Sequence, residues 1–184
     1  MSERTYDEKF HILQAPSLFL DDLAYYRAKC ELRNLGLVAA ALDIDGFKQF
    51  NARLGKPIVD RDILPRFMRA LEAHVFGRGY TYRFGGDEYM MLLPNTNTEA
   101  GCRFLVELQA RLMHIDYPGI DNKPTLSIGV CHVDQDCFLT EQEVAEKAIA
   151  AEEHAKRKGG NRIAAYKASL YREQDLCVYD EETK

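Results

Sequence analysis

Residues 80–93 read Tyr-Thr-Tyr-Arg-Phe-Gly-Gly-Asp-Glu-Tyr-Met-Met-Leu-Leu. Two runs of aromatic and aliphatic residues, Tyr80–Phe84 and Tyr89–Leu93, flank a pair of glycines and a pair of acids. Such runs are typical of strands, and a short connection that contains glycine joins two strands into a β-hairpin. The sequence therefore predicts a hairpin that carries Asp87 and Glu88 at its turn.

A second acidic stretch, Asp43-Ile44-Asp45, follows the compact apolar run Gly36–Leu42. The length of that run predicts a buried strand whose carboxyl end carries the acids. Carboxylates at a strand end and at a hairpin tip can meet over one site when the strands are neighbours. Mg²⁺ prefers oxygen ligands and shares its remaining positions with phosphate, and a two-metal site can neutralise a leaving pyrophosphate. Either cluster alone fits solvated turn acids better, because Asp favours turns.

The other expected elements place these acids within a fold. They are helices over Asp21–Arg33, Pro57–Val75, Glu99–Met113 and Thr140–Lys156, and strands over Thr125–Val133 and Ile163–Tyr166. The evidence is helical or alternating periodicity, a proline at the start of the second helix, and a capping box from Thr140 to Glu143. This order of elements predicts an α+β fold, an antiparallel-rich sheet with helices packed on it.

Composition narrows the class of protein. The chain has 184 residues, of which 46% are hydrophobic and 29% charged, enough for one core and unlike a disordered chain. Its net charge of −5 disfavours general nucleic-acid binding. Residues 1–10 carry no apolar signal core, and no apolar run is long enough to span a membrane. Five cysteines without a Cys-x-x-Cys pair indicate reduced thiols. We therefore expect a cytoplasmic protein without a membrane or nucleic-acid partner.

The segment Tyr82–Tyr89 resembles the signature of the GGDEF family of diguanylate cyclases, with Tyr89 where the family has phenylalanine. Three more stretches resemble family motifs in the same order: Leu42–Asn51, Leu126–Val130 and Ala155–Asn161. They correspond to the first metal-binding motif, the Ser-x-Gly strand and the end of the last helix. The resemblance implies a ferredoxin-like palm fold. It also implies a catalytic domain over residues 35–166, a helical extension over 1–34 and a polar tail over 167–184.

The resemblance further implies that the chain condenses two GTP into cyclic di-GMP and releases two pyrophosphates, through attack by each 3′-hydroxyl. Two Mg²⁺ ions per active site, with Mn²⁺ as the alternative, would be bound by the Asp43 and Asp87 carboxylates and the Ile44 carbonyl. Asp87 would also lie at the reacting 3′-hydroxyl. Glu88 would support the nucleotide or a metal-bound water, and Lys48 would stabilise developing charge.

The same resemblance implies how GTP binds. The amides of Gly46 and Phe47 would lie against the triphosphate, and Lys156 would hold the terminal phosphates. Asn51 and Asp60 would bind the guanine edge. A carboxylate only accepts hydrogen bonds, and guanine offers N1–H and an amine as donors, whereas N1 of adenine is an acceptor. The alternative for Asp60 is a solvated acid near the start of a helix, where acids are favourable.

Several positions depart from the family pattern. The usual leader, Leu-Thr-Gly-Leu and Asn-Arg, has no counterpart in residues 31–36, and Gly55–Asp60 keeps only the glycine and the aspartate of its motif. Gly160 stands where the family has an arginine, and Phe76–Gly79 lacks the Arg-x-x-Asp of an inhibitory product site. Asp45 matches the pattern, but we expect it to shape the turn. Control would come from expression, oligomerisation, residues 1–33 or a separate regulatory protein.

Each domain of this type holds one GTP, so the resemblance implies a homodimer in which two sites face each other. Two alternatives stay open. One is a palm-type cyclase that makes another cyclic oligonucleotide for phage defence, although Asn51 and Asp60 argue against an adenine substrate. The other is a degenerate GGDEF domain that only binds GTP or a protein, against which the intact acids and Lys48 argue.

Overall fold

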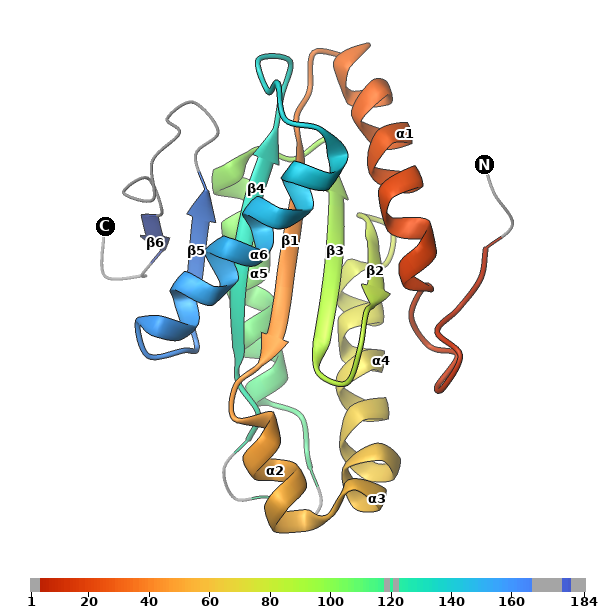
Figure 1. Cartoon of the computed structure of the whole chain (residues 1–184), viewed down its shortest axis with the longest axis vertical. Helices are drawn as coiled ribbons and strands as arrows, with labels where there is room; N and C mark the ends of the chain where they lie inside the picture. The colour runs from red at the N-terminus through yellow and green to blue at the C-terminus, as the bar shows by residue number, and fades with distance from the viewer. Residues whose placement is uncertain (1–3, 118–119, 121–122, 167–176, 180–184) are drawn as a thin grey trace.

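The computed structural model describes residues 4–117, 120 and 123–166, and the backbone of 177–179. A single sheet forms its centre, in the strand order β2-β3-β1-β4-β5-β6 (Figure 1). The strands are β1 Leu37–Ile44, β2 Tyr80–Arg83, β3 Glu88–Pro94, β4 Leu126–Val133, β5 Ile163–Tyr166 and β6 Cys177–Tyr179. All neighbours pair antiparallel except β4 and β5, which are parallel. The expected antiparallel-rich sheet is confirmed.

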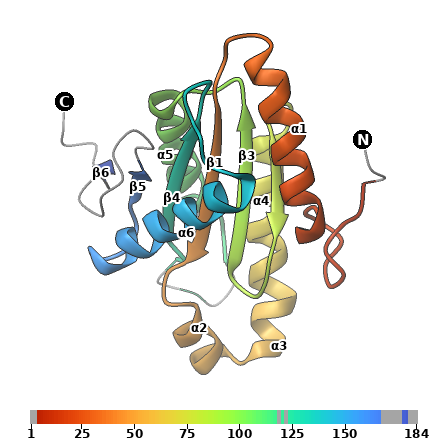
Figure 2. The ribbon, with the colours of Figure 1, turned by 45° about the horizontal axis from the view of Figure 1, so that its top comes forward.

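Helices cover both faces of this sheet. They are α1 Phe19–Glu31, α2 Phe47–Leu54, α3 Lys56–Ile58, α4 Leu64–Val75, α5 Thr98–Met113 and α6 Glu141–Arg157. Helices α1 and α6 lie on one face and α4 and α5 on the other, whereas α2 and α3 extend beyond the end of β1 (Figures 1 and 2). A 3₁₀ turn, Pro16–Leu18, precedes α1, and a π-helical turn, Val59–Ile63, precedes α4.

Strand β1 is buried along its whole length because apolar layers cover both of its faces. Its even-numbered apolar residues join a cluster that contains Phe67 of α4 and Leu105 of α5. Its odd-numbered apolar residues join a second cluster that contains Phe19 of α1 and Val144 of α6. The central strand is thereby fixed from both sides, and its last residues are held at a defined place.

The region between β1 and α4 differs from the expected single helix over Pro57–Val75. The chain forms α2, then α3, then the π-helical turn, and only then α4. Gly55, with φ of +82°, separates α2 from α3, a backbone conformation that glycine adopts without steric cost. Pro65 stands at the start of α4 and has no N–H to donate to a regular helical ladder.

Two further observations concern the C-terminal segment and the length of the helices. Of the expected polar tail, the structure describes only Cys177–Tyr179, whose backbone pairs with β5 as strand β6; the rest of that tail lies outside the described residues. Among the helices that the structure describes, none is both long and apolar enough to cross a bilayer.

Candidate active site

The end of β1 and the tip of the β2–β3 hairpin lie side by side. Asp43 is paired in register with Glu88, and the N–H of Ile44 donates to the carbonyl oxygen of Asp87 over 3.4 Å. A cleft of about 500 Å³ opens beside this junction. Its lining includes seven of the predicted site residues: Asp43, Ile44, Gly46, Phe47, Lys48, Asp87 and Lys156.

Lys156 enters the cleft from the last turn of α6. Its Nζ lies 2.7 Å from Asp43 Oδ2 and 3.2 Å from Glu152 Oε1. Burial acts to lower the pKa of Lys156, but the hydrogen bond and charge of Asp43, together with Glu152, raise the pKa overall. The ammonium therefore stays charged and supplies a cation between two carboxylates.

The acids Asp43, Asp45 and Asp87 of the cleft outnumber its two lysines, Lys48 and Lys156. Burial, followed by repulsion from Asp87 and Glu88, raises the pKa of Asp43 to about 6 although Lys156 opposes the shift. Burial also raises the pKa of Asp87 and raises that of Glu152 to about 7. A cluster of this kind favours a cation or a protonated carboxyl.

Asp45 is tied to the neighbouring strands. Its carboxylate accepts hydrogen bonds from Thr125 Oγ1 at 2.7 Å, Ser127 Oγ at 2.6 Å and the Asn161 N–H at 2.9 Å. These bonds join the end of β1 to β4 and to the segment that enters β5. The contacts support the expected role of Asp45 in shaping the turn.

The turn after Asp45 leads directly into α2. Gly46 has φ of +68°, a conformation that favours glycine, and its carbonyl accepts the N–H groups of Gln49 and Phe50. The first N–H groups of a helix have no partner within the helix and make its start an anion-binding site. Those groups, at Phe47 and Lys48, lie at the mouth of the cleft.

Gly160, at the position where the family pattern has an arginine, adopts a backbone conformation that favours glycine. Gly160 has φ of +72°, and a Cβ there would come within 2.9 Å of Asp45 Oδ1. A side chain at this position would be strained and would press on the acid that orders the turn. Arg162 lies nearby, and its Nε donates to the Gly160 carbonyl over 3.2 Å.

Three predicted residues do not line this cleft. Glu88 is exposed at the start of β3. Asn51 is on α2, and its Oδ1 is buried without a hydrogen-bond partner among the described residues. Asp60, in the π-helical turn, forms an ion pair with Lys9, with 2.6 Å between Nζ and Oδ2. Asn51 and Asp60 thus lie along α2 and the segment after α3, away from the acidic junction.

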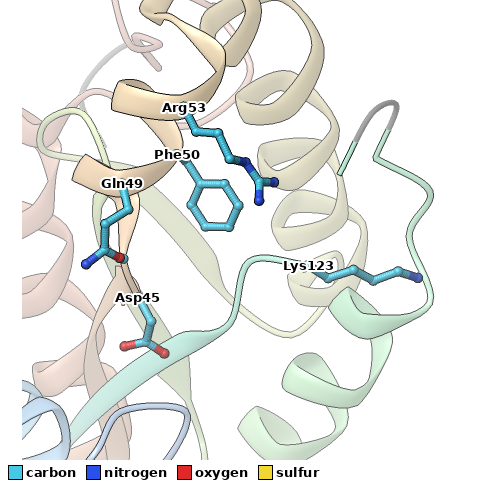
Figure 3. A pocket seen from close by; sticks show the side chains of 6 residues that line it. Asp45, Gln49, Phe50, Arg53 and Lys123 are labelled. Carbon is cyan, nitrogen blue, oxygen red and sulfur yellow. The ribbon is translucent and has the colours of Figure 1, made fainter. Parts of the chain in front are cut away.

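A second, smaller cleft of about 350 Å³ adjoins the first. Asp45, Gly46 and Gln49 line both clefts. Phe50, Arg53 and Lys123 complete the lining of the smaller one (Figure 3), and Lys123 Nζ donates to the Met113 carbonyl over 2.6 Å. The two clefts meet at the start of α2.

Sequence reasoning missed some residues that the structure brings to the site. Glu152 is one: it is 6% exposed on the buried face of α6, which is otherwise made of Val144 and alanines. An acid on a small apolar helix face, four residues before Lys156, was the available signal. Lys9 is another, and nothing in its local sequence indicates that it reaches Asp60.

Comparisons by sequence and by structure identify relatives of this chain among known proteins. The family model described as diguanylate cyclase, GGDEF domain, matches residues 13–162. Diguanylate cyclase DosC of Escherichia coli K12 is 27% identical over 162 residues, which cover 84% of this chain and 33% of the relative. Diguanylate cyclase DgcP of Pseudomonas aeruginosa is 32% identical over 129 residues, which cover 69% of this chain and 19% of the relative. The chain thus spans a third or less of these two relatives.

Solved structures give the same fold. The GGDEF domain of DgcB from Caulobacter crescentus, in complex with c-di-GMP, aligns with a TM-score of 0.77 and 24% identity, over 90% of this chain and 96% of that one. Diguanylate cyclase SiaD of Pseudomonas aeruginosa, in complex with its activator SiaC, aligns with a TM-score of 0.77 and 25% identity, over 87% and 61%. Because the family model matches residues 13–162 of the 184 residues, the chain belongs to the GGDEF-domain family of diguanylate cyclases.

Proposed function

We propose that this chain is a diguanylate cyclase that condenses two GTP into cyclic di-GMP and two pyrophosphates. The observation that carries the proposal is the meeting of Asp43 and Asp87 beside the first turn of α2, with Lys156 in the same cleft. That cleft offers oxygen ligands on one side and phosphate-binding groups on the other. The two together suit the transfer of a nucleotidyl group.

The donor set fits a hard divalent cation. Within the described residues, no group of three or more His, Cys, Asp or Glu side chains is placed to hold a metal ion alone. Asp43, Asp87 and the Ile44 carbonyl would therefore supply part of a coordination shell, as is usual for Mg²⁺, which keeps waters and substrate phosphates. We propose two Mg²⁺ per site, with Mn²⁺ as the alternative. When bound, they would lower the pKa of the 3′-hydroxyl and neutralise the leaving pyrophosphate.

The chain's own residues would bind and orient the triphosphate. The N–H groups of Gly46 and Phe47, together with that of Lys48, would face the phosphates. The Lys48 ammonium would offset charge that develops on the transferred phosphate. Lys156, now 2.7 Å from Asp43, would exchange part of that contact for the terminal phosphates. Asp87 would accept a hydrogen bond from the 3′-hydroxyl, and Glu88 would order a water or the nucleotide.

Asn51 and Asp60 would bind the base. The unpaired Oδ1 of Asn51 is an acceptor for which a guanine amine is a suitable donor. A buried acceptor without a partner is costly, so a ligand that pairs with it gains affinity. The Asp60 carboxylate would accept from guanine N1–H and N2–H, which adenine cannot match.

Catalysis would need two chains, because one site holds one GTP and the product contains two. We propose a homodimer with the two clefts facing each other, acting in the cytoplasm. A separate regulatory protein is a further proposed partner; the complex of SiaD with its activator SiaC shows that one cyclase with this fold has such a partner.

A competition assay tests the choice of base. The protein is given equal GTP and ATP with Mg²⁺, and products are identified by mass. We expect cyclic di-GMP, because a site that pairs donors can reject a base without them by several orders of magnitude. Asp60→Ser should raise the share of adenine in the product, whereas the matched control Asp62→Ser, whose acid pairs with Arg61, should not. A mainly adenine-containing product from wild type would overturn the assignment.

A further inference from the structure

The N-terminal segment forms a closed loop over residues 7–13. Asp7, 3% exposed, accepts hydrogen bonds from the N–H groups of Phe10 at 2.9 Å and Ile12 at 3.3 Å. The Asp7 N–H donates to the Leu13 carbonyl over 2.9 Å. These bonds give the loop a defined shape and leave Lys9 near its tip.

The loop is attached to strand β2, just before the hairpin turn. The Gln14 N–H donates to the Thr81 carbonyl at 3.0 Å, and the Arg83 N–H donates to the Gln14 carbonyl at 3.1 Å. Arg83 Nη1 lies 3.5 Å from Asp7 Oδ1, and its guanidinium stacks 4.9 Å from the Phe10 ring centre. Figures 1 and 2 show this segment beside β2. The position of Lys9 is therefore fixed relative to the hairpin that carries the catalytic acids.

Lys9 lies over the ring of its neighbour Phe10, with 5.1 Å from Nζ to the ring centre, and also forms an ion pair with a distant residue. Its Nζ lies 2.6 Å from Asp60 Oδ2, and in the part of the chain that the structure describes it is the only polar partner of that carboxylate. The Lys9 side chain is 44% exposed and the Asp60 side chain 24%. Ion pairs this exposed add little to stability. The pair joins the loop to a π-helical turn, a distortion that is frequent at functional sites.

We propose that Lys9 is a specificity-determining residue that donates a hydrogen bond to O6 of guanine; this rests on the proposed function. The pairing edge of guanine presents the N2 amine, N1–H and O6 in a row. A carboxylate that accepts from the first two leaves O6 next to one of its oxygens. The Lys9 ammonium is already bonded to Oδ2 and has two further N–H groups. When guanine N1–H pairs with Oδ2, O6 would lie next to that ammonium.

The pair then distinguishes guanine from adenine at two points. Adenine has an acceptor at N1, which would face the Asp60 carboxylate, and an amine at C6, which would face the Lys9 ammonium. Both contacts would be repulsive or unpaired. Because Lys9 belongs to the N-terminal loop, the choice of base would depend on a residue that precedes Asp43, the first acid of the cleft, by more than thirty positions.

Binding of nucleoside diphosphates tests the inference without turnover. GDP keeps the guanine edge but cannot release pyrophosphate, and 6-thio-GDP keeps both donors while replacing O6 with sulfur, a weaker acceptor. Affinities are measured by calorimetry with Mg²⁺ for wild type, Lys9→Met and the control Lys29→Met, an exposed lysine on α1. We expect wild type to bind GDP about tenfold more tightly than 6-thio-GDP, as a charge-assisted hydrogen bond implies.

The variants separate the outcomes. Lys9→Met should lose affinity for GDP about tenfold and bind the two nucleotides within about twofold of each other, whereas Lys29→Met should behave as wild type. Equal loss for both nucleotides would mean that Lys9 only holds the loop, and tighter GDP binding would mean that it only blocks Asp60; either result overturns the inference while leaving the proposed function intact. Wild type that prefers ADP, or binds neither base, would overturn both.

Discussion

The backbone of α6 lies very close to the sheet at Gly129, and a side chain at that position should destabilise the fold around the site. A Cβ at Gly129 would lie 2.0 Å from the carbonyl oxygen of Ala148 and 2.1 Å from the backbone nitrogen of Glu152. Both atoms belong to the backbone of α6, so no rotamer change relieves the clash. Overpacking a core costs about 1–3 kcal/mol, and we expect Gly129→Ala to fall at the upper end, about 3 kcal/mol. That is roughly a hundredfold change in the unfolding equilibrium.

Gly101→Ala is the matched control. Its Cβ would meet the Val38 Cγ2 methyl at 2.9 Å, which a side chain can relieve, and alanine is favoured over glycine within a helix by about 1 kcal/mol. We expect a net change within about 1 kcal/mol of zero. Urea unfolding followed by circular dichroism gives both values. Gly129→Ala should also lose turnover, because α6 carries Lys156. Equal stability of the two variants, or a Gly129→Ala loss under about 0.5 kcal/mol, would refute the reasoning.

Three more predictions concern single side chains. Asp87→Asn keeps the shape but removes the charge, so turnover should fall about a hundredfold or more at an unchanged unfolding midpoint; a variant that keeps a tenth of wild-type turnover would remove Asp87 from the site. Asp45→Asn turns an amide toward three donors and should cost about 2 kcal/mol in urea unfolding; a cost near zero would argue against its role in the turn. Burial lowers the pKa of His74, although its bond to the Phe104 carbonyl opposes this. The neutral form is thus favoured in the folded state, so neutral His74 adds to the free energy of unfolding. This contribution is complete above about pH 6.5 and is lost as the pH falls below that value. The unfolding midpoint should therefore drop more steeply toward pH 5 in wild type than in His74→Gln, and parallel profiles would contradict the assignment.

The sequence predicts best the elements whose signals are local. The apolar run before Asp43 marks β1, and the glycine pair marks the hairpin turn. The capping box at the start of α6 is confirmed: the Glu143 N–H donates to Thr140 Oγ1, and the Glu143 carboxylate accepts from the Thr140 N–H. In each case the deciding atoms lie within a few residues of one another.

Other features depend on contacts between distant segments and leave no such signal. The π-helical turn around Asp60 arises where α3 meets a proline-led helix, and Lys9 reaches Asp60 across 51 positions of the chain (9 to 60). The resemblance to the family implies that Lys156 binds the phosphates. The ion pair between Lys156 and Asp43, however, depends on how α6 packs against the sheet, which no local sequence signal indicates. The placement of Asn51 and Asp60 at the base stays a prediction, as does the division of the chain at residues 34 and 166.

The central claim is that the two acids and the first turn of α2 form a site that joins two GTP molecules. Its most direct test is to count pyrophosphate against cyclic product when the protein is incubated with GTP and Mg²⁺. We predict two pyrophosphates for each molecule with the mass of cyclic di-GMP, no product without the metal, and a rate that rises faster than linearly with protein at low concentration. A linear product, one pyrophosphate per product, or bound GTP that is never consumed would contradict the account.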